Sequence, residues 1–309
     1  MFQAFGTDYR HFLSRGKRAL DRAEYDYAVD TYSQAVGLCP NLSYAYYQRG
    51  RAYGYQSKWQ LAVDDYTRVL QIDPFDMNAY YMRGRALGSL GKYNAAIADL
   101  SHVIENYPEY GEGFFMRGIM YASAEFFNLA IADYSRALEL DEDMARGYYW
   151  RAELYVARFA WKEALADYQK VIEIDPRDSY AFIGRSRVER KVGRIIPAME
   201  DVNMSIAINS RNPEAFSLRG LLYADIGEHE KAVREHSRAI ELGKDSPEEL
   251  CNRGRAYFRM ERFFEAQADL VKALEIDRKY TEAHALMKGF GLDSVTLTTG
   301  EKISREAVV

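Results

Sequence analysis

The chain repeats itself at a fixed interval of 34 residues through residues 9–280. An alanine series runs from Ala28 to Ala266 without a gap, and an arginine series keeps the same phase. Those arginines, each followed by glycine, alanine or serine, are Arg15, Arg49, Arg83, Arg117, Arg151, Arg185, Arg219 and Arg253. Self-similarity at a period of about 20–50 residues is typical of stacked repeat arrays. The sequence therefore predicts eight repeats, at residues 9–42, 43–76, 77–110, 111–144, 145–178, 179–212, 213–246 and 247–280.

Each repeat carries two helical patterns. In the second repeat a large, a small and a large residue stand four and three positions apart, at Tyr46, Gly50 and Tyr53. The second half repeats that kind of spacing around Ala62 and Tyr66. Such spacing marks one face of a helix, and helices of about a dozen residues are ordinary. A lone helix pair cannot bury this face, so we expect neighbouring pairs to stack.

At this point the residues resemble the tetratricopeptide repeat family. Its pattern of large, small, aromatic and alanine positions with a closing proline is found in the second repeat as Tyr46, Gly50, Tyr53, Ala62, Tyr66, Val69 and Pro74. The resemblance covers residues 9–280 and implies an all-α, right-handed solenoid of antiparallel helix pairs, the superhelix of this family. The closing proline is missing after repeats four, six, seven and eight. Repeat six departs most, with Glu189 at an aromatic position and Pro197 early in its second helix.

The ends of the chain stand outside the period. We expect residues 1–8 to form an N-terminal cap, in which Phe2 and Phe5 cover the first helix and Thr7 or Asp8 caps it. Residues 281–291 predict a C-terminal capping helix stopped by glycine. Residues 292–309 carry no period, and we expect them to form a flexible tail.

Composition favours a soluble cytoplasmic protein. No apolar run is long enough to span a bilayer, and the first residues do not resemble a signal peptide. Cys39 and Cys251 stand far apart in the sequence without paired spacing, which suits free thiols in a reducing compartment.

Nothing in the sequence favours an enzyme. Stacking uses most of the chain, no glycine-rich phosphate loop follows a strand, and the five histidines lack metal-ligand spacing. His229 and His236 occupy the places where another repeat has Trp59 and Tyr66, so we interpret them as packing residues. We therefore predict no catalytic residue, no metal site and no cofactor.

A second phased series suggests what the arginines do. In repeats two to eight an acid follows the arginine at one constant spacing: Asp65, Asp99, Asp133, Asp167, Asp201, Glu235 and Asp269. The first repeat has Thr31 at this place. A ladder of charge-assisted hydrogen bonds between the two helices of each repeat explains a matched series. The alternative is a row of anion-binding arginines in a groove.

The resemblance also implies where a partner binds. In this family the first helices line a concave groove, into which the second, fifth, ninth, twelfth and thirteenth residues of each repeat point. Tyrosine beside arginine gives rigid contact area with a directed charge, which is typical of protein recognition. The groove residues that we predict as the binding site are Tyr44, Tyr47, Arg51, Tyr55, Asn78, Tyr81, Arg85, Phe115, Tyr149, Arg187, Arg190, Lys191, Arg255 and Arg259.

Charge indicates what kind of partner fits. The groove positions hold ten basic and six acidic residues, a net charge of +4 in a chain of net charge −5. We therefore expect an acidic peptide or helical segment with aromatic or apolar anchors. A structural subunit that uses the convex face and the ends remains an alternative. Nucleic-acid binding is disfavoured, because no basic stripe runs along all repeats.

One familiar subclass is disfavoured as well. Members that grip the carboxylate tails of heat-shock chaperones have lysine at the fifth and asparagine at the ninth place of the first repeat. Here the fifth place of the first repeat is Leu13, and no ninth place holds asparagine. A chaperone-tail clamp is therefore not expected.

Overall fold

The computed structural model describes residues 8–291, a range that contains seventeen helices and no strand. The predicted all-α fold is confirmed. The helices group into two compact bodies, residues 8–154 and 155–291, called here the N-terminal and the C-terminal body. Phe2, Phe5, Thr7 and the predicted tail at 292–309 lie outside the described residues.

The helices follow one another at regular intervals. The first nine are α1 Asp8–Asp21, α2 Tyr25–Leu38, α3 Ser43–Tyr55, α4 Trp59–Ile72, α5 Met77–Ser89, α6 Tyr93–Asn106, α7 Gly111–Ser123, α8 Phe127–Leu140 and α9 Ala145–Ala157, inside which the boundary falls. The others are α10 Trp161–Ile174, α11 Ser179–Lys191, α12 Ile195–Ile208, α13 Pro213–Asp225, α14 His229–Glu241, α15 Pro247–Arg259, α16 Phe263–Ile276 and α17 Thr281–Gly289.

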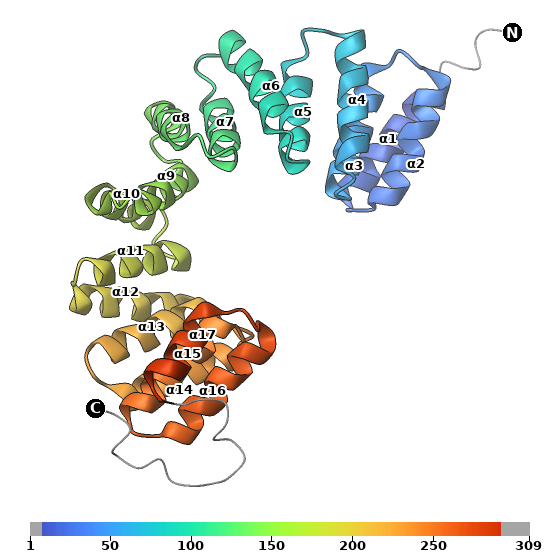
Figure 1. The fold of residues 1–309 in the computed structure, drawn as a ribbon. Helices are drawn as coiled ribbons and strands as arrows, with labels where there is room; N and C mark the ends of the chain where they lie inside the picture. The colour runs from blue at the N-terminus through green and yellow to red at the C-terminus, as the bar shows by residue number, and fades with distance from the viewer. Residues whose placement is uncertain (1–7, 292–309) are drawn as a thin grey trace, which may run out of the picture. The chain divides into compact units, whose positions relative to one another are not determined.

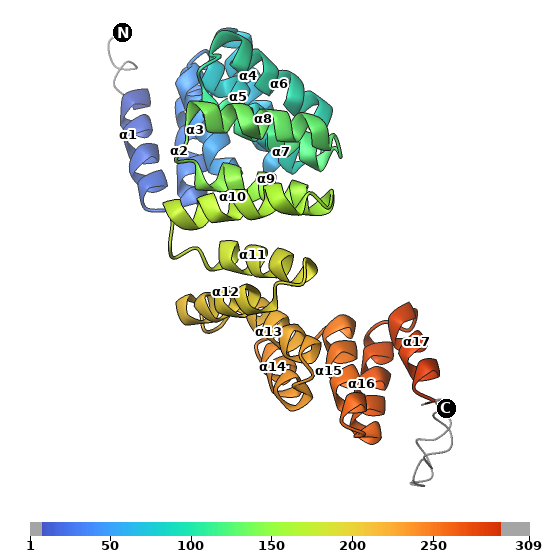
Figure 2. The ribbon, with the colours of Figure 1, turned by 90° about the vertical axis from the view of Figure 1, so that its left-hand side faces the viewer.

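Consecutive helices pack as antiparallel pairs, and each pair packs on the next within its body (Figures 1 and 2). Small residues allow the close approach. A Cβ atom at Gly50 would lie 2.9 Å from the ring of Tyr66, and one at Gly118 would lie 2.7 Å from Tyr134. Both tyrosines are almost fully buried, as is Ala62 between the helices of its pair. The large-and-small pattern of the sequence therefore forms the core of each pair.

The turn inside each pair has one recurring backbone conformation. Its second-last residue takes a left-handed φ between 58° and 80° in every described repeat: Ala23, Ser57, Gly91, Glu125, Phe159, Gly193, Gly227 and Glu261. The amide that follows donates back to an earlier carbonyl of the first helix, as from Lys58 to Tyr53 at 2.9 Å. This contact ends the first helix by a Schellman motif, for which glycine is preferred. The chain uses glycine in only three of these turns.

The last helix covers the end of the C-terminal body. Helix α17 packs against α15 and α16, and Ala283 and Met287 are buried in that contact. The ring of Phe290, just after the helix, stacks on Phe258 with 3.7 Å between centroids. The apolar face of the final pair is therefore closed by a short helix.

Candidate functional site

The phased arginines pair with the phased acids of their own repeat. Arg117 donates from two nitrogens to the two oxygens of Asp133, at 2.8 and 2.9 Å. Equivalent contacts join Arg49 to Asp65, Arg83 to Asp99, Arg185 to Asp201 and Arg253 to Asp269, whereas Arg219 donates from one nitrogen to both oxygens of Glu235. These contacts confirm the ladder. Because both carboxylate oxygens are used, the arginines stabilise the helix pairs instead of forming a row of ligand-binding groups.

Each ladder arginine also reaches the preceding repeat. The remaining terminal nitrogen of Arg117 donates to the hydroxyl of Ser101 on α6, at 2.9 Å. Its guanidinium also lies 5.8 Å from the ring centroid of Phe114. The equivalent acceptors in other repeats are Ser33, Thr67, Ser135, Gln169, Asn203 and Ser237. One arginine therefore joins three helices. The sequence carries a signal for this contact, a polar residue as far before each arginine as the acid stands after it, which our sequence analysis missed.

Burial shapes the ionisation of these pairs. Desolvation raises the pKa of Asp65 above its usual range and outweighs the opposite effect of the Arg49 charge. The hydrogen bond to Asp65 in turn raises the pKa of Arg49 against the effect of burial. The pair is therefore joined by charge-assisted hydrogen bonds in a partly desolvated site.

The N-terminal body contains an apolar pocket of about 490 Å³ between α3 and α7. Three methionines line it, Met82 on α5 and Met116 and Met120 on α7, together with aromatic rings from α4 and α6. Arg51 and Arg85 also belong to its lining. We call it the methionine pocket. Both arginines occupy predicted groove positions, but the three methionines do not, because only the packing of α7 against α5 brings them to the pocket.

The two arginines of this pocket have no acidic partner among residues 8–291. Arg51 donates to Gln48 at 2.9 Å, and Arg85 lies 3.7 Å from the sulfur of Met82. Burial alone would lower the pKa of Arg51, but the tyrosines around it, Tyr55 foremost, together outweigh that effect and raise its pKa. A guanidinium group is always charged in proteins, so both arginines can bind a carboxylate from outside.

The other predicted tyrosines of α3 differ in exposure. Tyr44 and Tyr55 are 45% and 55% exposed. Tyr55 stacks on Tyr25 with 4.9 Å between centroids, and it also lines the methionine pocket. Tyr47 is half-buried, with its ring 5.7 Å from that of Tyr66, so it braces the helix pair.

Further along, one predicted residue lies in the core. Phe115 is only 3% exposed and its ring packs against Tyr134, so its side chain offers no open surface. The guanidinium of Arg146 lies 4.6 Å from the Phe115 ring and pairs with Glu112. The expectation of an exposed strip at Phe115 failed because this ring fills the space between helices. Tyr149 is half-buried beside Trp150, at 5.7 Å.

A second, smaller pocket of about 320 Å³ lies where α5 begins and α6 ends. We call it the tyrosine pocket. It contains the predicted residues Asn78 and Tyr81, and it adds Met77, Val103, Tyr107, Glu109 and Tyr110. Tyr81 is half-buried and donates to Glu112 at 2.9 Å. Helix α5 therefore contributes to both pockets of the N-terminal body.

Several predicted cations of the C-terminal body pair with nearby acids. Arg190 donates to Asp225 with a shortest distance of 2.5 Å, and Arg255 pairs with Glu282 on α17. Arg187, Lys191 and Arg259 have exposed side chains. The excess positive charge counted along the sequence is thus partly neutralised here, because acids on neighbouring helices face these arginines.

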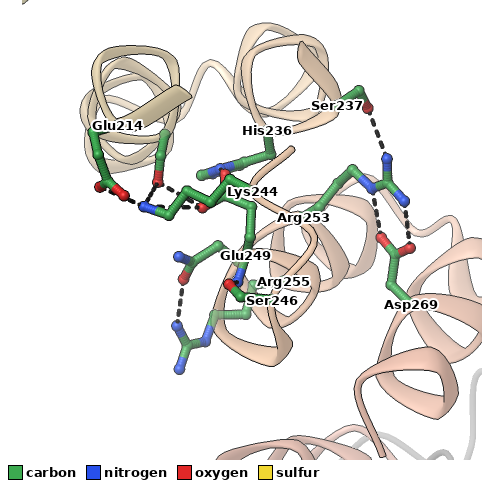
Figure 3. A network of polar contacts seen from close by, with 11 residues as sticks. Glu214, His236, Ser237, Lys244, Ser246, Glu249, Arg253, Arg255 and Asp269 are labelled. Carbon is green, nitrogen blue, oxygen red and sulfur yellow. Dashed lines mark hydrogen bonds and ion pairs between the residues drawn. The ribbon is translucent and has the colours of Figure 1, made fainter. Parts of the chain in front are cut away.

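The same body buries a polar network between α13, α14 and α15 (Figure 3). His236 and Glu249 are both fully buried, and His236 Nδ1 lies 2.6 Å from a Glu249 oxygen. Ser217 donates to the other oxygen at 2.6 Å, while Lys244 lies 3.7 Å from it and pairs with Glu214. Burial alone would raise the pKa of Glu249, but these neighbours outweigh it and lower that pKa. His236 is a packed residue, as predicted, and it also belongs to a buried hydrogen-bond network.

Comparisons with known proteins fit this geometry. Models described as tetratricopeptide repeat match residues 43–76, 65–98, 145–178 and 247–287. The chain belongs to the tetratricopeptide repeat family. Proteins of this family mediate protein–protein interaction or assembly, and they are typically non-enzymatic scaffolds. A comparison with curated proteins gave no match.

Solved tetratricopeptide repeat structures share the fold. A protein from Parabacteroides merdae is 20% identical, with a TM-score of 0.63 over 84% of this chain and 99% of that one. YrrB, described as having an unusual peptide-binding site, is 23% identical, with a TM-score of 0.50 over 61% and 97%. The Cut9–Hcn1 hetero-tetramer of the APC/C is 15% identical, with a TM-score of 0.58 over 90% and 68%.

Two searches of the described tetratricopeptide repeat region bear on other classes of site. Within residues 8–291, no helix is long and apolar enough to cross a membrane. The same residues contain no group of three or more histidine, cysteine or acidic side chains suited to a metal ion.

Proposed function

We propose that this protein is a non-enzymatic scaffold whose N-terminal body binds an acidic peptide or helical segment of a partner protein. An aromatic or large apolar side chain of that segment enters the methionine pocket, and a neighbouring carboxylate contacts Arg51 or Arg85. The family's general role in protein–protein interaction supports this proposal, as does the likeness to YrrB, whose description names a peptide-binding site.

One observation carries the proposal: two charged arginines line an apolar pocket and have no carboxylate partner among residues 8–291. Several other arginines of this body do have an acid, as Arg49, Arg83 and Arg117 have in the ladder and as Arg146 has in Glu112. A cation left without a partner beside apolar surface favours an external acid, since the apolar surroundings strengthen the attraction.

The lining of the pocket suits a large side chain. Its volume of about 490 Å³ lies in the range of ligand pockets, which is about 300–1,000 Å³. Methionine is unbranched and polarisable, so the three methionines can adapt to anchors of different shape. A Cβ atom at Gly88 would lie 2.3 Å from the sulfur of Met120, so glycine is what allows Met120 to take its place there.

A peptide-display selection on the full chain tests the proposal. We expect enriched peptides to contain acidic residues beside one large apolar residue. They should lose at least tenfold in affinity for the variant Arg51→Glu with Arg85→Glu. Arg177→Glu with Arg211→Glu is the matched control, because it changes the net charge equally at exposed turns of the C-terminal body. Enriched peptides that bind both double variants as tightly as the parent would refute the proposal.

A role as a subunit of a larger assembly is supported by a different surface. At the start of α8, Phe126, Phe127 and Leu129 are 51%, 39% and 50% exposed. The likeness to Cut9, solved in a hetero-tetramer, also supports such a role. If it is the main function, Phe126→Ser with Leu129→Ser will release a purified partner, while the Arg51 and Arg85 variants will retain it.

The compartment and the class of partner complete the proposal. Cys39 and Cys251 are both free thiols, which supports a reducing, cytoplasmic location. The net charge of −5 supports a protein partner over a nucleic acid.

A further inference from the structure

The tyrosine pocket has a chemistry unlike that of the methionine pocket. Tyr81 comes from α5, while Tyr107 and Tyr110 come from the turn between α6 and α7. The rings of Tyr81 and Tyr110 meet edge to face, with 5.8 Å between centroids and 69° between planes. Tyr107 and Tyr110 are 48% and 40% exposed. Three aromatic rings therefore surround one opening.

These rings lack a contact that the chain makes at other aromatic residues. Ladder arginines lie over the aromatic ring three positions before them in six pairs: Arg49–Tyr46, Arg83–Tyr80, Arg117–Phe114, Arg151–Tyr148, Arg185–Phe182 and Arg219–Phe216. No arginine or lysine among residues 8–291 lies over the rings of Tyr81, Tyr107 or Tyr110. Burial raises the pKa of Tyr110 and the charges of Arg85 and Arg146 act against it, but no cation of the described chain covers the faces of the three rings.

A carboxylate completes the pocket. Glu109 is exposed and forms no ion pair within the described part of the chain. The nearby Glu112 is already occupied by Tyr81 and Arg146, and Arg85 belongs to the lining of the other pocket. Glu109 is therefore the acid that remains available to a ligand beside the three rings.

We propose that the tyrosine pocket binds the lysine or arginine side chain of a partner protein. The ring faces attract the cation, and Glu109 pairs with it at the rim. The pocket volume of about 320 Å³ lies at the lower end of the range for ligand sites, about 300–1,000 Å³, and suits one long side chain. This site stands independently of the methionine pocket, since neither Arg51 nor Arg85 belongs to it.

Methionine methyl signals can report on the two pockets separately. Met77 lines the tyrosine pocket, while Met82, Met116 and Met120 line the other. The full chain, labelled at its methionine methyl groups, is titrated with Nα-acetyl-arginine N-methylamide, the lysine analogue, tetramethylammonium chloride and neutral Nα-acetyl-norleucine N-methylamide. We expect saturable shifts of the Met77 signal with the arginine or lysine compound, in the millimolar range, and none with the norleucine compound.

Variants separate this site from its surroundings. Glu109→Gln should weaken binding of the arginine compound at least threefold, and Tyr107→Leu with Tyr110→Leu should abolish the Met77 shift. Glu142→Gln, in the equivalent turn of the next repeat, is the matched control and should change nothing. Arg51→Ala with Arg85→Ala should also leave the Met77 response intact. The proposal for the tyrosine pocket can therefore hold or fail independently of the proposal that the methionine pocket binds an acidic segment. A helical circular dichroism spectrum checks that each variant is folded.

Three outcomes would overturn the proposal. The first is an equal Met77 shift with the norleucine compound, which would show an apolar site. The second is binding that is unchanged by the tyrosine changes in a folded variant. The third is a Met77 shift with tetramethylammonium alone, which would assign the pocket to small quaternary amines instead of a protein side chain.

Discussion

The junction between neighbouring repeats is built from apolar residues at one place in the N-terminal body and from polar residues at the equivalent place in the C-terminal body. Around α4, Tyr66 packs over Gly50, Ala79 follows at the start of α5, and Pro74 stands in the turn between them. Around α14, the equivalent residues are His236 over Gly220, Glu249 and Lys244. The first junction is apolar, whereas the second buries a carboxylate in contact with a histidine, with a lysine beside it.

The difference shows that the backbone of the repeat does not depend on one kind of junction. A Cβ atom built on the facing glycine would lie 2.9 Å from the Tyr66 ring and 2.8 Å from the His236 ring, so the helices approach equally closely. What differs is how strongly a side-chain substitution at the junction lowers the stability of the fold. An apolar junction loses area when a side chain shrinks, while an ionic one leaves a buried charge without its partner. The C-terminal junction should therefore be the more fragile of the two.

The largest effect is expected for Glu249→Ala. Removing this carboxylate leaves buried His236 and Ser217 without this partner and Lys244 with Glu214 alone, and we expect a loss of about 3–5 kcal/mol in the free energy of unfolding. Denaturant unfolding followed by circular dichroism measures it. The triple change His236→Tyr, Lys244→Pro and Glu249→Ala, which copies the α4 junction, should recover most of the loss. If the single change costs under about 1 kcal/mol, the two junctions are equally robust.

The next effect concerns the ladder. Arg117→Leu should cost about 2–3 kcal/mol, less than for a fully buried pair, because the Arg117 side chain is 20% exposed. Arg15→Leu is the matched control, since Arg15 lies over Tyr27 but has Thr31 where other repeats have an acid. We expect it to cost under about 1 kcal/mol in the same unfolding assay. Equal losses would mean that the helix pair is stabilised by packing of the arginine side chain's aliphatic part and not by its contact with the carboxylate.

A smaller effect should appear in repeat six. Buried Glu189, Ser205 and Asn212 each have a polar side-chain atom without a hydrogen-bond partner in the described chain. We expect amide exchange in residues 179–212 to be about tenfold faster than in residues 43–178, a difference of about 1.4 kcal/mol in opening free energy. Glu189→Tyr restores the aromatic residue and should slow the exchange. Uniform protection along both bodies would contradict this prediction.

The smallest effect is a difference in the response to acid. The pKa of Glu249 is lowered in the folded state, so its contribution to stability is lost as the pH falls through that value. The pKa of Asp65 is raised, so its protonation favours the folded state as the pH falls. Below about pH 4.3, the ordinary value for glutamate, protection of α14 and α15 should therefore decline before that of α3 and α4. Exchange measured between pH 6 and pH 3 tests the order, and the reverse order would contradict it.

The candidate site was only partly predictable. The period placed Arg51, Arg85 and Tyr55 on first helices, and the structure brings all three to one pocket. It could not show that Arg190 and Arg255 are paired, because their acids belong to later helices. Phe115 occupies a groove position in the sequence but fills the core, since α8 lies close enough to cover its ring.

The sequence by itself determined the helix pairs, their small-and-large packing and the partner of each ladder arginine. These features depend on contacts within one repeat, which a constant period copies along the chain. The tertiary structure decided which charges remain available and where the pockets lie. Those properties arise where side chains from three or more helices meet, and a carboxylate on one helix determines whether a distant arginine is free to bind. Glu109 and Glu112 stand close together in the sequence, yet packing occupies Glu112 and leaves Glu109 open.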